Sequence, residues 1–232
     1  MNAQEDEISP SNWDYLIQPY LLFPNMSGET AIGDLPAIDV DADIGDIFGH
    51  LKFGAMLYLE ATNNTWTVST DLIYMHLNQE VKKGDFITDG EANMKQFVAE
   101  LAGLRRVSPW LEAGIGARLV SLNVDLDFET VLSTRNAETS ETWVDPVIIA
   151  RSNGNFNEDW LYMLRFDFGG FGIGSDFTWQ LQADIGYNFS ETFYTSLGYR
   201  FMSIDYNKGN GSDLFVYDID TYGAVLKFGI NL

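Results

Sequence analysis

The 232-residue sequence contains no cysteine. Disulfides, thiolate metal sites and cysteine nucleophiles are therefore excluded. The sequence also lacks any run approaching the ~18 consecutive apolar residues of a membrane helix, although 46% of its residues are hydrophobic. If the chain crosses a bilayer, it must do so as a closed β-barrel, because lipid offers no hydrogen bonds to unpaired backbone groups.

Positive charge is scarce, with 13 Lys and Arg against 34 Asp and Glu and a formal net charge of -21. Nucleic acid is an improbable partner for such a chain, because its phosphates require clustered cations. Residues 1–7 have neither a basic region nor an apolar core, so no secretion signal is visible. We expect an exported protein that has lost its signal, with Met1 placed before the mature sequence. We expect a flexible segment at 1–12 and a single barrel domain at 13–232.

Apolar and polar residues alternate along nearly the whole chain, and the clearest stretch is 177–188. Strands in soluble proteins centre on ~5 to 6 residues, so alternation over twelve favours a membrane wall. Ten segments carry the pattern, an even number as bacterial barrels require. They are 13–26, 50–62, 65–78, 93–106, 109–124, 142–152, 157–170, 176–189, 192–206 and 215–231.

The connectors between these segments differ in length. Tight turns are expected at 63–64, 107–108, 153–155 and 190–191, and longer joins at 27–49, 79–92, 125–141, 171–175 and 207–214. Brief periplasmic turns and longer extracellular loops give this rhythm in outer-membrane barrels. The sequence therefore predicts an all-β fold: a closed antiparallel up-and-down transmembrane barrel of ten strands, with eight as the alternative and both termini periplasmic.

Aromatic residues gather at the ends of the expected strands, where amphipathic rings favour the level of the lipid headgroups. Trp110 and Trp143 are expected to point inward. The predicted lipid-facing girdle comprises Trp13, Tyr15, Trp66, Tyr74, Trp160, Tyr162, Trp179 and Phe193.

Charged residues fall on the strand face opposite the apolar one. A charge facing the lipid midplane costs ~2–4 kcal/mol, so these residues are expected in the lumen, where both signs can pair. We expect ion pairs and hydrogen bonds to fill a narrow interior, and a conducting polar pore is the alternative. The predicted lumen network comprises Lys52, Glu60, Asp71, Glu100, Glu112, Arg118, Asp145, Arg151, Arg165, Asp167, Asp184, Arg200 and Lys227.

Candidate catalytic and metal-binding patterns are weak. The acidic stretch 39–46 fails the EF-hand spacing, because His50 stands where that loop needs a bidentate Glu. Loose binding of divalent cations between acidic loops and lipopolysaccharide phosphates is an alternative to solvated loop carboxylates. The parities of His50 and His76 put them on opposite faces, so no convergent acid/base or nucleophile set is evident. We expect no enzymatic activity, catalytic residue, bound metal or cofactor.

The last strand resembles the C-terminal signal by which the outer-membrane assembly machinery recognises its clients. Thr221, Gly223, Leu226 and Phe228 match that pattern, although the chain ends in Leu232 where many such proteins end in Phe. Further segments resemble a family of small Gram-negative outer-membrane proteins, porin-like or OmpA-like and largely uncharacterised. These segments are 46–56, 114–118, 143–146, 169–180 and 198–200.

The resemblance implies an outer-membrane location, with outer-membrane lipids, lipopolysaccharide and the assembly machinery as partners, and no known catalytic residues. The expected function is a structural or surface-presenting barrel, with limited passage of small solutes. The alternatives are a selective diffusion channel, a soluble lipocalin-like barrel whose apolar face lines a ligand cavity, and an enzyme with its site at the outer rim.

Overall fold

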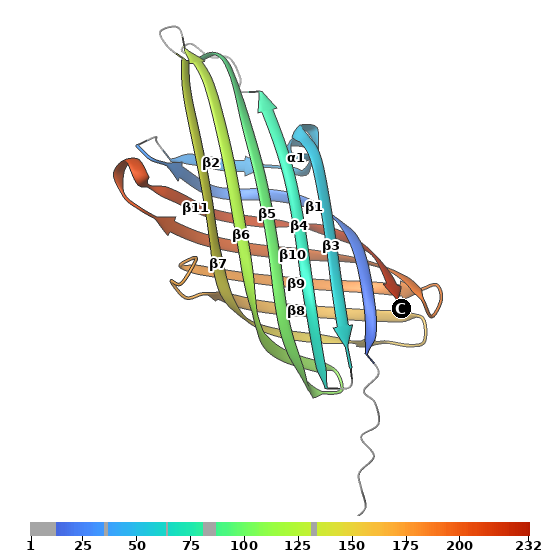
Figure 1. The fold of residues 1–232 in the computed structure, drawn as a ribbon. Helices are drawn as coiled ribbons and strands as arrows, with labels where there is room; N and C mark the ends of the chain where they lie inside the picture. Colours follow the sequence, from blue (N-terminus) through green and yellow to red (C-terminus); the bar gives the residue numbers. More distant parts are fainter. Residues whose placement is uncertain (1–12, 35–36, 64, 81–86, 131–133) are drawn as a thin grey trace, which may run out of the picture.

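A computed structural model describes residues 13–34, 37–63, 65–80, 87–130 and 134–232. One sheet closes on itself (Figure 1). Its elements are β1 (Asp14–Ile32), β2 (Ile38–Ala42), α1 (Ile44–His50), β3 (Leu51–Thr62), β4 (Trp66–Glu80), β5 (Ile87–Ser108), β6 (Leu111–Thr130), β7 (Thr134–Asn155), β8 (Trp160–Gly170), β9 (Phe177–Asn188), β10 (Phe193–Lys208), a 3-10 turn η1 (Gly211–Asp213) and β11 (Phe215–Asn231).

Ten strands make the barrel wall. Each of β3 to β10 pairs antiparallel with the next strand, β1 pairs with β3, and β1 closes the barrel against β11 from Leu16↔Asn231 to Ile32↔Phe215. The extra strand β2 pairs only with β1. In the described part of the chain, neither helical element has the length and apolar character to cross a membrane.

The predicted closed barrel of ten antiparallel strands is confirmed, and the eight-strand alternative is wrong. The expected segment at 27–49 is not simply a loop, because it contains β2 and α1. The expected polar loop at 125–141 is also wrong: β6 continues to Thr130 and β7 begins at Thr134, so this segment is mostly paired strand. The expected N-terminal segment 1–12 lies outside the described residues.

The two ends of the barrel differ. The end that carries Trp13, Leu232 and the short β3–β4, β5–β6, β7–β8 and β9–β10 connections is called the turn end, and the other the loop end. Two asparagines close turns there: Asn63 Oδ1 accepts hydrogen bonds from the backbone N–H groups of Thr65 and Trp66, and Asn157 Oδ1 from those of Asp159 and Trp160. Such side-chain acceptors stabilise tight turns. At the loop end, β5, β6 and β7 rise above the opposite wall (Figure 1).

The acidic stretch in the first long connection forms the start of α1. The Asp43 side chain accepts a hydrogen bond of 2.9 Å from the Asp46 backbone N–H, and the Asp46 carboxylate accepts one from the Asp43 backbone N–H. This is a capping box, which satisfies backbone donors that a helix start leaves free. These two carboxylates therefore have a structural role at the loop end.

Gly114 of β6 is held against the neighbouring backbone of β5. A Cβ at this position would lie 2.0 Å from the Gly103 carbonyl oxygen and 2.7 Å from Leu104 Cα. Because backbone atoms of a paired strand cannot move aside independently, we expect Gly114→Ala to lower the free energy of unfolding by ~1–3 kcal/mol. Urea titration of the protein folded into vesicles measures this loss.

The matched control is Gly103→Ala, on the adjacent strand. Gly103 is exposed, and a Cβ there would meet no atom within 4 Å. We expect its unfolding midpoint to stay at the wild-type value. Equal midpoints for the two variants would contradict a close approach of β5 and β6 at Gly114.

Candidate functional site

The interior of the barrel holds a belt of buried charges, here called the ionic layer. All the charged residues predicted for the lumen lie in it except Lys52, and all of these except Asp145 form ion pairs. Lys52 is instead exposed, so its expected lumen position is wrong. It lies at a β-bulge, where Leu51 and Phe53 pair with consecutive residues of β4. An extra residue at a bulge breaks the alternation of faces.

The first cluster of the ionic layer joins β5, β6 and β8. Arg118 donates hydrogen bonds to Glu100 at 2.7 Å and to Asp167 at 2.6 Å, and Arg165 also pairs with both carboxylates. Thr178 Oγ1 of β9 also accepts a hydrogen bond from Arg118 at 3.2 Å. Two guanidinium groups and two carboxylates thus balance, and their donors and acceptors satisfy one another, as buried charges require.

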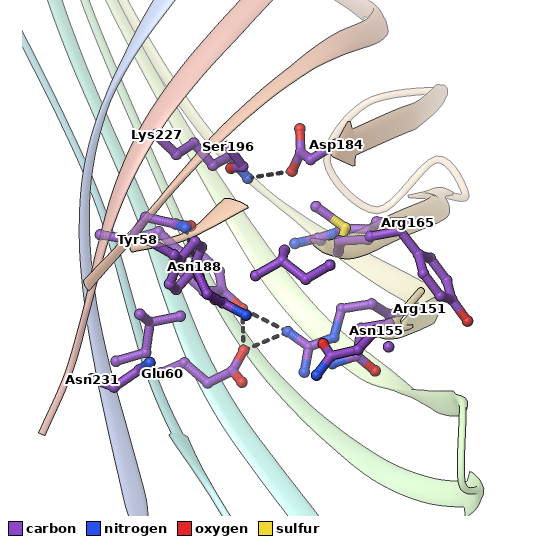
Figure 2. Close-up of a pocket in the computed structure, with 18 of the residues that line it drawn as sticks. Tyr58, Glu60, Arg151, Asn155, Arg165, Asp184, Asn188, Ser196, Lys227 and Asn231 are labelled. Carbon is purple, nitrogen blue, oxygen red and sulfur yellow. Dashed lines mark hydrogen bonds and ion pairs between the residues drawn. The ribbon is translucent and has the colours of Figure 1, made fainter. Parts of the chain in front are cut away.

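A second cluster lies nearer the turn end. The Arg151 guanidinium of β7 donates to Glu60 of β3 and to Glu112 of β6, and Glu112 also accepts from the Thr67 hydroxyl at 2.9 Å. Tyr58 donates its hydroxyl hydrogen to Glu60. Figure 2 shows Arg151 and Glu60 extending toward each other from different strands. The guanidinium therefore crosses the bore and connects opposite walls.

The third cluster joins β1, β4, β9, β10 and β11. Arg200 donates to Asp71 at 2.6 Å, and the Tyr20 hydroxyl donates to the same carboxylate at 2.7 Å. Beside them, Lys227 pairs with Asp184 at 2.9 Å (Figure 2). Its ammonium lies 5.9 Å from the Tyr20 ring centroid. Asp71 of β4 is thus tied to β10 through Arg200 and to β1 through Tyr20.

Asp145 is fully buried and is held by hydrogen bonds alone. It accepts from the Trp143 indole Nε1–H at 3.1 Å and from the Ser175 backbone N–H at 2.6 Å. Trp143 points inward, as expected from the sequence, and stacks on Tyr206 with ring centroids 3.9 Å apart. The same expectation is wrong for Trp110, which is 56% exposed in the turn between β5 and β6. Asp145 thus fixes the β8–β9 connection against β7.

Above the ionic layer, toward the loop end, the bore is filled by inward apolar side chains, here called the apolar plug. Sequence reasoning missed it, since it assigned charge to the whole lumen. The available signal was a break in alternation, as at 72–75 and 119–120, where both strand faces are apolar. The plug comprises Tyr20, Leu22, Met26, Ile47, Ile73, Met75, Val98, Val120, Leu122, Trp143, Met202, Ile204, Tyr206, Phe215, Tyr217, Ile219 and Val225.

On the other side of the ionic layer is a cavity of about 740 Å³ at the turn end, here called the vestibule (Figure 2). Its floor includes Arg165 and Arg200 of the ionic layer, and its rim carries Glu158, Asp159 and Glu191 from the turns. The interior therefore has three levels: an accessible vestibule, a belt of paired charges and an apolar plug.

The loop-end rim carries a smaller set of charges, on the parts of β7, β10 and β11 that lie beyond the membrane-spanning depth. The exposed Lys208 ammonium donates to Glu141 at 2.8 Å, and this hydrogen bond raises the pKa of Lys208. Partial burial raises the pKa of the Asp205 carboxyl, and the nearby negative charges of Asp218 and Asp176 raise it further. These groups face water and lie apart from the ionic layer.

The predicted aromatic girdle lies on the outer face of the wall. Trp13, Tyr15, Trp66, Trp160 and Phe193 are exposed near the turn end. The other members are partly buried beside an outer aromatic: Tyr74 by Phe53, Tyr162 by Phe156 and Trp179 by Phe201. The structure adds Tyr187 and Phe189, which continue the contacts from Trp160 to Phe193.

The residues predicted as an assembly signal lie on β11, the closing strand. Leu226 and Phe228 are outward, and Thr221 and Gly223 are inward. A Cβ on Gly223 would lie 1.9 Å from the Phe23 carbonyl oxygen of β1, so this glycine permits the strands to close. Recognition by the assembly machinery stays a prediction.

The two histidines do not meet. His50 Nδ1 is 2.6 Å from the Asp46 carbonyl oxygen at the end of α1, and His76 Nε2 is 3.0 Å from Asn93 Oδ1 on the neighbouring strand. Within the described residues, no group of three or more His, Asp and Glu side chains is arranged to hold a metal ion.

The fold matches solved structures at very low sequence identity. The outer membrane protease OmpT from Escherichia coli has a TM-score of 0.50 and 8% identity, over 97% of this chain and 98% of that one. Ail, the attachment invasion locus protein of Yersinia pestis, has a TM-score of 0.35 and 9% identity, with 96% and 99% covered. Neisserial surface protein A has a TM-score of 0.33 and 10% identity, over 94% of this chain and 96% of that one.

This chain has the fold of a Gram-negative outer-membrane β-barrel. No family model and no curated protein matches the sequence. Large apolar side chains such as Leu101, Ile115 and Leu197 are exposed on the outer wall, whereas the charged side chains of the ionic layer are buried inside. Lipid provides the apolar surroundings that such a wall requires. The lipocalin-like alternative is wrong, because it needs a watery exterior around a cavity lined by the apolar face.

Proposed function

We propose that this protein is a non-enzymatic, non-conducting outer-membrane barrel that anchors and presents a surface sheet outside the cell. The observation that carries the proposal is the filled bore. A solute entering the vestibule meets paired charges at Arg118 and Arg165, and behind them the plug around Val120 and Ile204. Open aqueous channels are characteristic of ~16 or more strands, because lumen width grows with strand number.

The surface sheet is the part of β5, β6 and β7 at the loop end, and its length supports the presenting role. The strands β5, β6 and β7 have 22, 20 and 22 residues, whereas a tilted strand needs ~9–11 to cross a bilayer. About half of each strand therefore extends beyond the membrane at the loop end, which corresponds to the extracellular side. β-Pairing continues in this part: Ala92 of β5 pairs with Leu126 of β6, and Asp127 of β6 pairs with Asn136 of β7. A paired sheet is a firmer platform for contacts than a loop.

The non-enzymatic part of the proposal is supported by the separation of His50 from His76 and by the pairing of the interior carboxylates with cations. The proposed partners are outer-membrane lipids, lipopolysaccharide and the assembly machinery. Divalent cations are proposed to bridge the exposed carboxylates of the first connection, such as Asp39 and Asp41, to lipid phosphates.

Planar-bilayer recording tests the closed bore. We expect no stable conductance steps from the purified barrel, because the ionic layer and the apolar plug leave no continuous water path. A porin of large bore inserted under the same conditions is the control for the recording, and a shift of electrophoretic mobility on heating is the control for folding. Stable ohmic steps from the folded protein would overturn the proposal and favour a selective diffusion channel.

A further inference from the structure

The barrel wall is not fully paired between β1 and β3. Their ladder runs from Asp14↔Thr62 to Pro19↔Leu57 and ends there. From Met26 onward, β1 pairs instead with the short strand β2. Figure 1 shows β1 turning away from β3 beyond their lower halves, with α1 above the space between them. We call this part of the wall, Tyr20–Asn25 of β1 and Leu51–Met56 of β3, the β1–β3 seam.

Two features lower the cost of the interrupted ladder. The Leu22 backbone N–H donates to the Met56 sulfur at 3.3 Å, and Pro24 has no N–H to donate. Beside them, the Asn25 side chain accepts from the Ile44 backbone N–H and so holds the start of α1 over the seam. Unpaired backbone groups in hydrocarbon cost several kcal/mol each, so a satisfied Leu22 and a proline at position 24 help the interruption to persist within a membrane.

The seam is apolar on both sides. On its outer side, Leu21 is 50% exposed and Phe53 is 58% exposed. On its inner side, Leu51 and Met56 pack against the apolar plug. At its loop end, Phe48 of α1 stacks on Phe23 of β1 with ring centroids 5.7 Å apart. At the seam, side chains separate the hydrocarbon outside the barrel from the plug, because no β1–β3 backbone hydrogen bonds close the wall there.

The plug behind the seam is rich in methionine. Of the seven methionines in the chain, Met26, Met75 and Met202 belong to the plug, and Met56 and Met94 pack against it. Unbranched thioether side chains adapt to irregular apolar ligands because they rearrange at low cost. This concentration suits a site that a flexible hydrocarbon chain enters from the side.

We propose that the β1–β3 seam binds one acyl chain of a phosphate-bearing lipid of the outer leaflet. The seam lies in the half of the wall toward the loop end, which faces that leaflet if the barrel is inserted as proposed above. Lys52 is exposed where β3 begins, so its ammonium is available to a lipid phosphate at the level of the headgroups. The chain would lie over the exposed Gly54, beside the Leu22–Met56 hydrogen bond, and contact the plug. This inference rests on the proposed membrane location.

The test uses vesicles that contain phosphatidylglycerol with a photoreactive diazirine on one acyl chain. After irradiation, peptide mass spectrometry locates the crosslinks. We expect them on the inward residues Leu22 and Met56 as well as on the lipid-facing residues Leu181 and Ile185. Crosslinks on Leu181 and Ile185 alone would overturn the seam proposal and leave the membrane location intact. Their absence from Leu181 and Ile185 would contradict the membrane location itself.

Two glycine variants provide a matched pair. A Cβ on Gly54, which is paired with Met75, would lie 3.6 Å from Leu51 Cδ2, an ordinary contact, so Gly54→Leu fills the seam without a backbone clash. Gly103→Leu adds the same side chain to the lipid-facing side of β5, where there is open space. We expect inward crosslinking relative to outward crosslinking to fall about fivefold in Gly54→Leu, as loss of one or two buried methylenes implies.

In Gly103→Leu, the ratio of inward to outward crosslinking should stay at the wild-type value. An equal ratio in the Gly54→Leu and Gly103→Leu variants would overturn the proposal. Unlabelled lipid A distinguishes the source of the chain. If it lowers inward crosslinking beyond simple dilution of the probe, the seam takes lipid A; if it acts by dilution alone, the seam takes phospholipid.

Discussion

Arg118→Met is expected to lower the free energy of unfolding by ~3–5 kcal/mol, the usual cost of breaking a buried ion pair by removing one partner. Arg118 is 1% exposed and donates to Glu100 and Asp167. Without it, two buried carboxylates share the single guanidinium of Arg165. Methionine fills much of the same space, so the loss reports charge rather than a cavity. Urea titration in vesicles, followed by tryptophan fluorescence, measures it.

A double variant separates charge imbalance from other effects of the substitution. In Arg118→Met with Asp167→Asn, one cation and one carboxylate are removed together, and Glu100 keeps Arg165. We expect this variant to recover more than half of the lost stability. Lys208→Met is the surface control, because Lys208 is exposed at the loop-end rim, and its midpoint should match the wild type. If Arg118→Met behaves like Lys208→Met, the ionic layer does not stabilise the barrel.

The position of the wall strands was predictable because lipid imposes a simple rule on them. In β9, outward Leu181 and Ile185 alternate with inward Gln182 and Asp184, so a period of two is visible in the sequence alone. The rule applies only at membrane depth. Beyond that depth the rule weakens: alternation continues in β6 through Leu126 and Phe128, but the polar stretch 134–141 carries none even though it is strand.

The elements of the first long connection were missed for a different reason. The short strand β2 exists because β1 offers it an unpaired edge at Met26–Thr30. That edge is free because β3 pairs with β1 only from Leu57 to Thr62. This is a property of the assembled sheet. The start of α1 did have a local signal: Asp43 and Asp46 have the spacing of a capping box. The same two residues had been weighed only as candidate cation ligands.

The charged residues of the interior were predictable as a set, but their partners were not. Arg200 and Asp71 are 129 positions apart and meet across the bore from β10 and β4. Their contact depends on the register of every intervening strand and on how far the bore can be spanned. Alternation indicates which face a residue occupies, and it contains no information about the opposite wall. The change of the inward face to apolar beyond Arg118, at Val120 and Leu122, is indicated only by the break in alternation at 119–120.

Trp143→Ala should destabilise the barrel by ~3–5 kcal/mol, as removal of a buried tryptophan does in other cores. The indole is 5% exposed, stacks on Tyr206 and lies 6.1 Å from the Tyr217 ring, so its loss leaves a hole at the centre of the apolar plug. It also removes the hydrogen bond to the buried Asp145 carboxylate. The same urea titration, followed by circular dichroism because the variant changes tryptophan content, measures the effect.

Two further variants test whether the plug, rather than tryptophan content, accounts for that loss. Trp143→Phe keeps an aromatic ring against Tyr206 but cannot donate to Asp145, so only the ~1–3 kcal/mol of an unsatisfied polar group is expected. Trp160→Ala removes an indole that is 45% exposed on the outer wall, where lipid fills the space, and its effect should be smaller than that of Trp143→Ala. The plug side chains come from different strands and pack against one another. The same packing that closes the bore should therefore also stabilise the barrel. Equal losses from Trp143→Ala and Trp160→Ala would therefore contradict both the packed plug and the closed bore on which the proposed function depends.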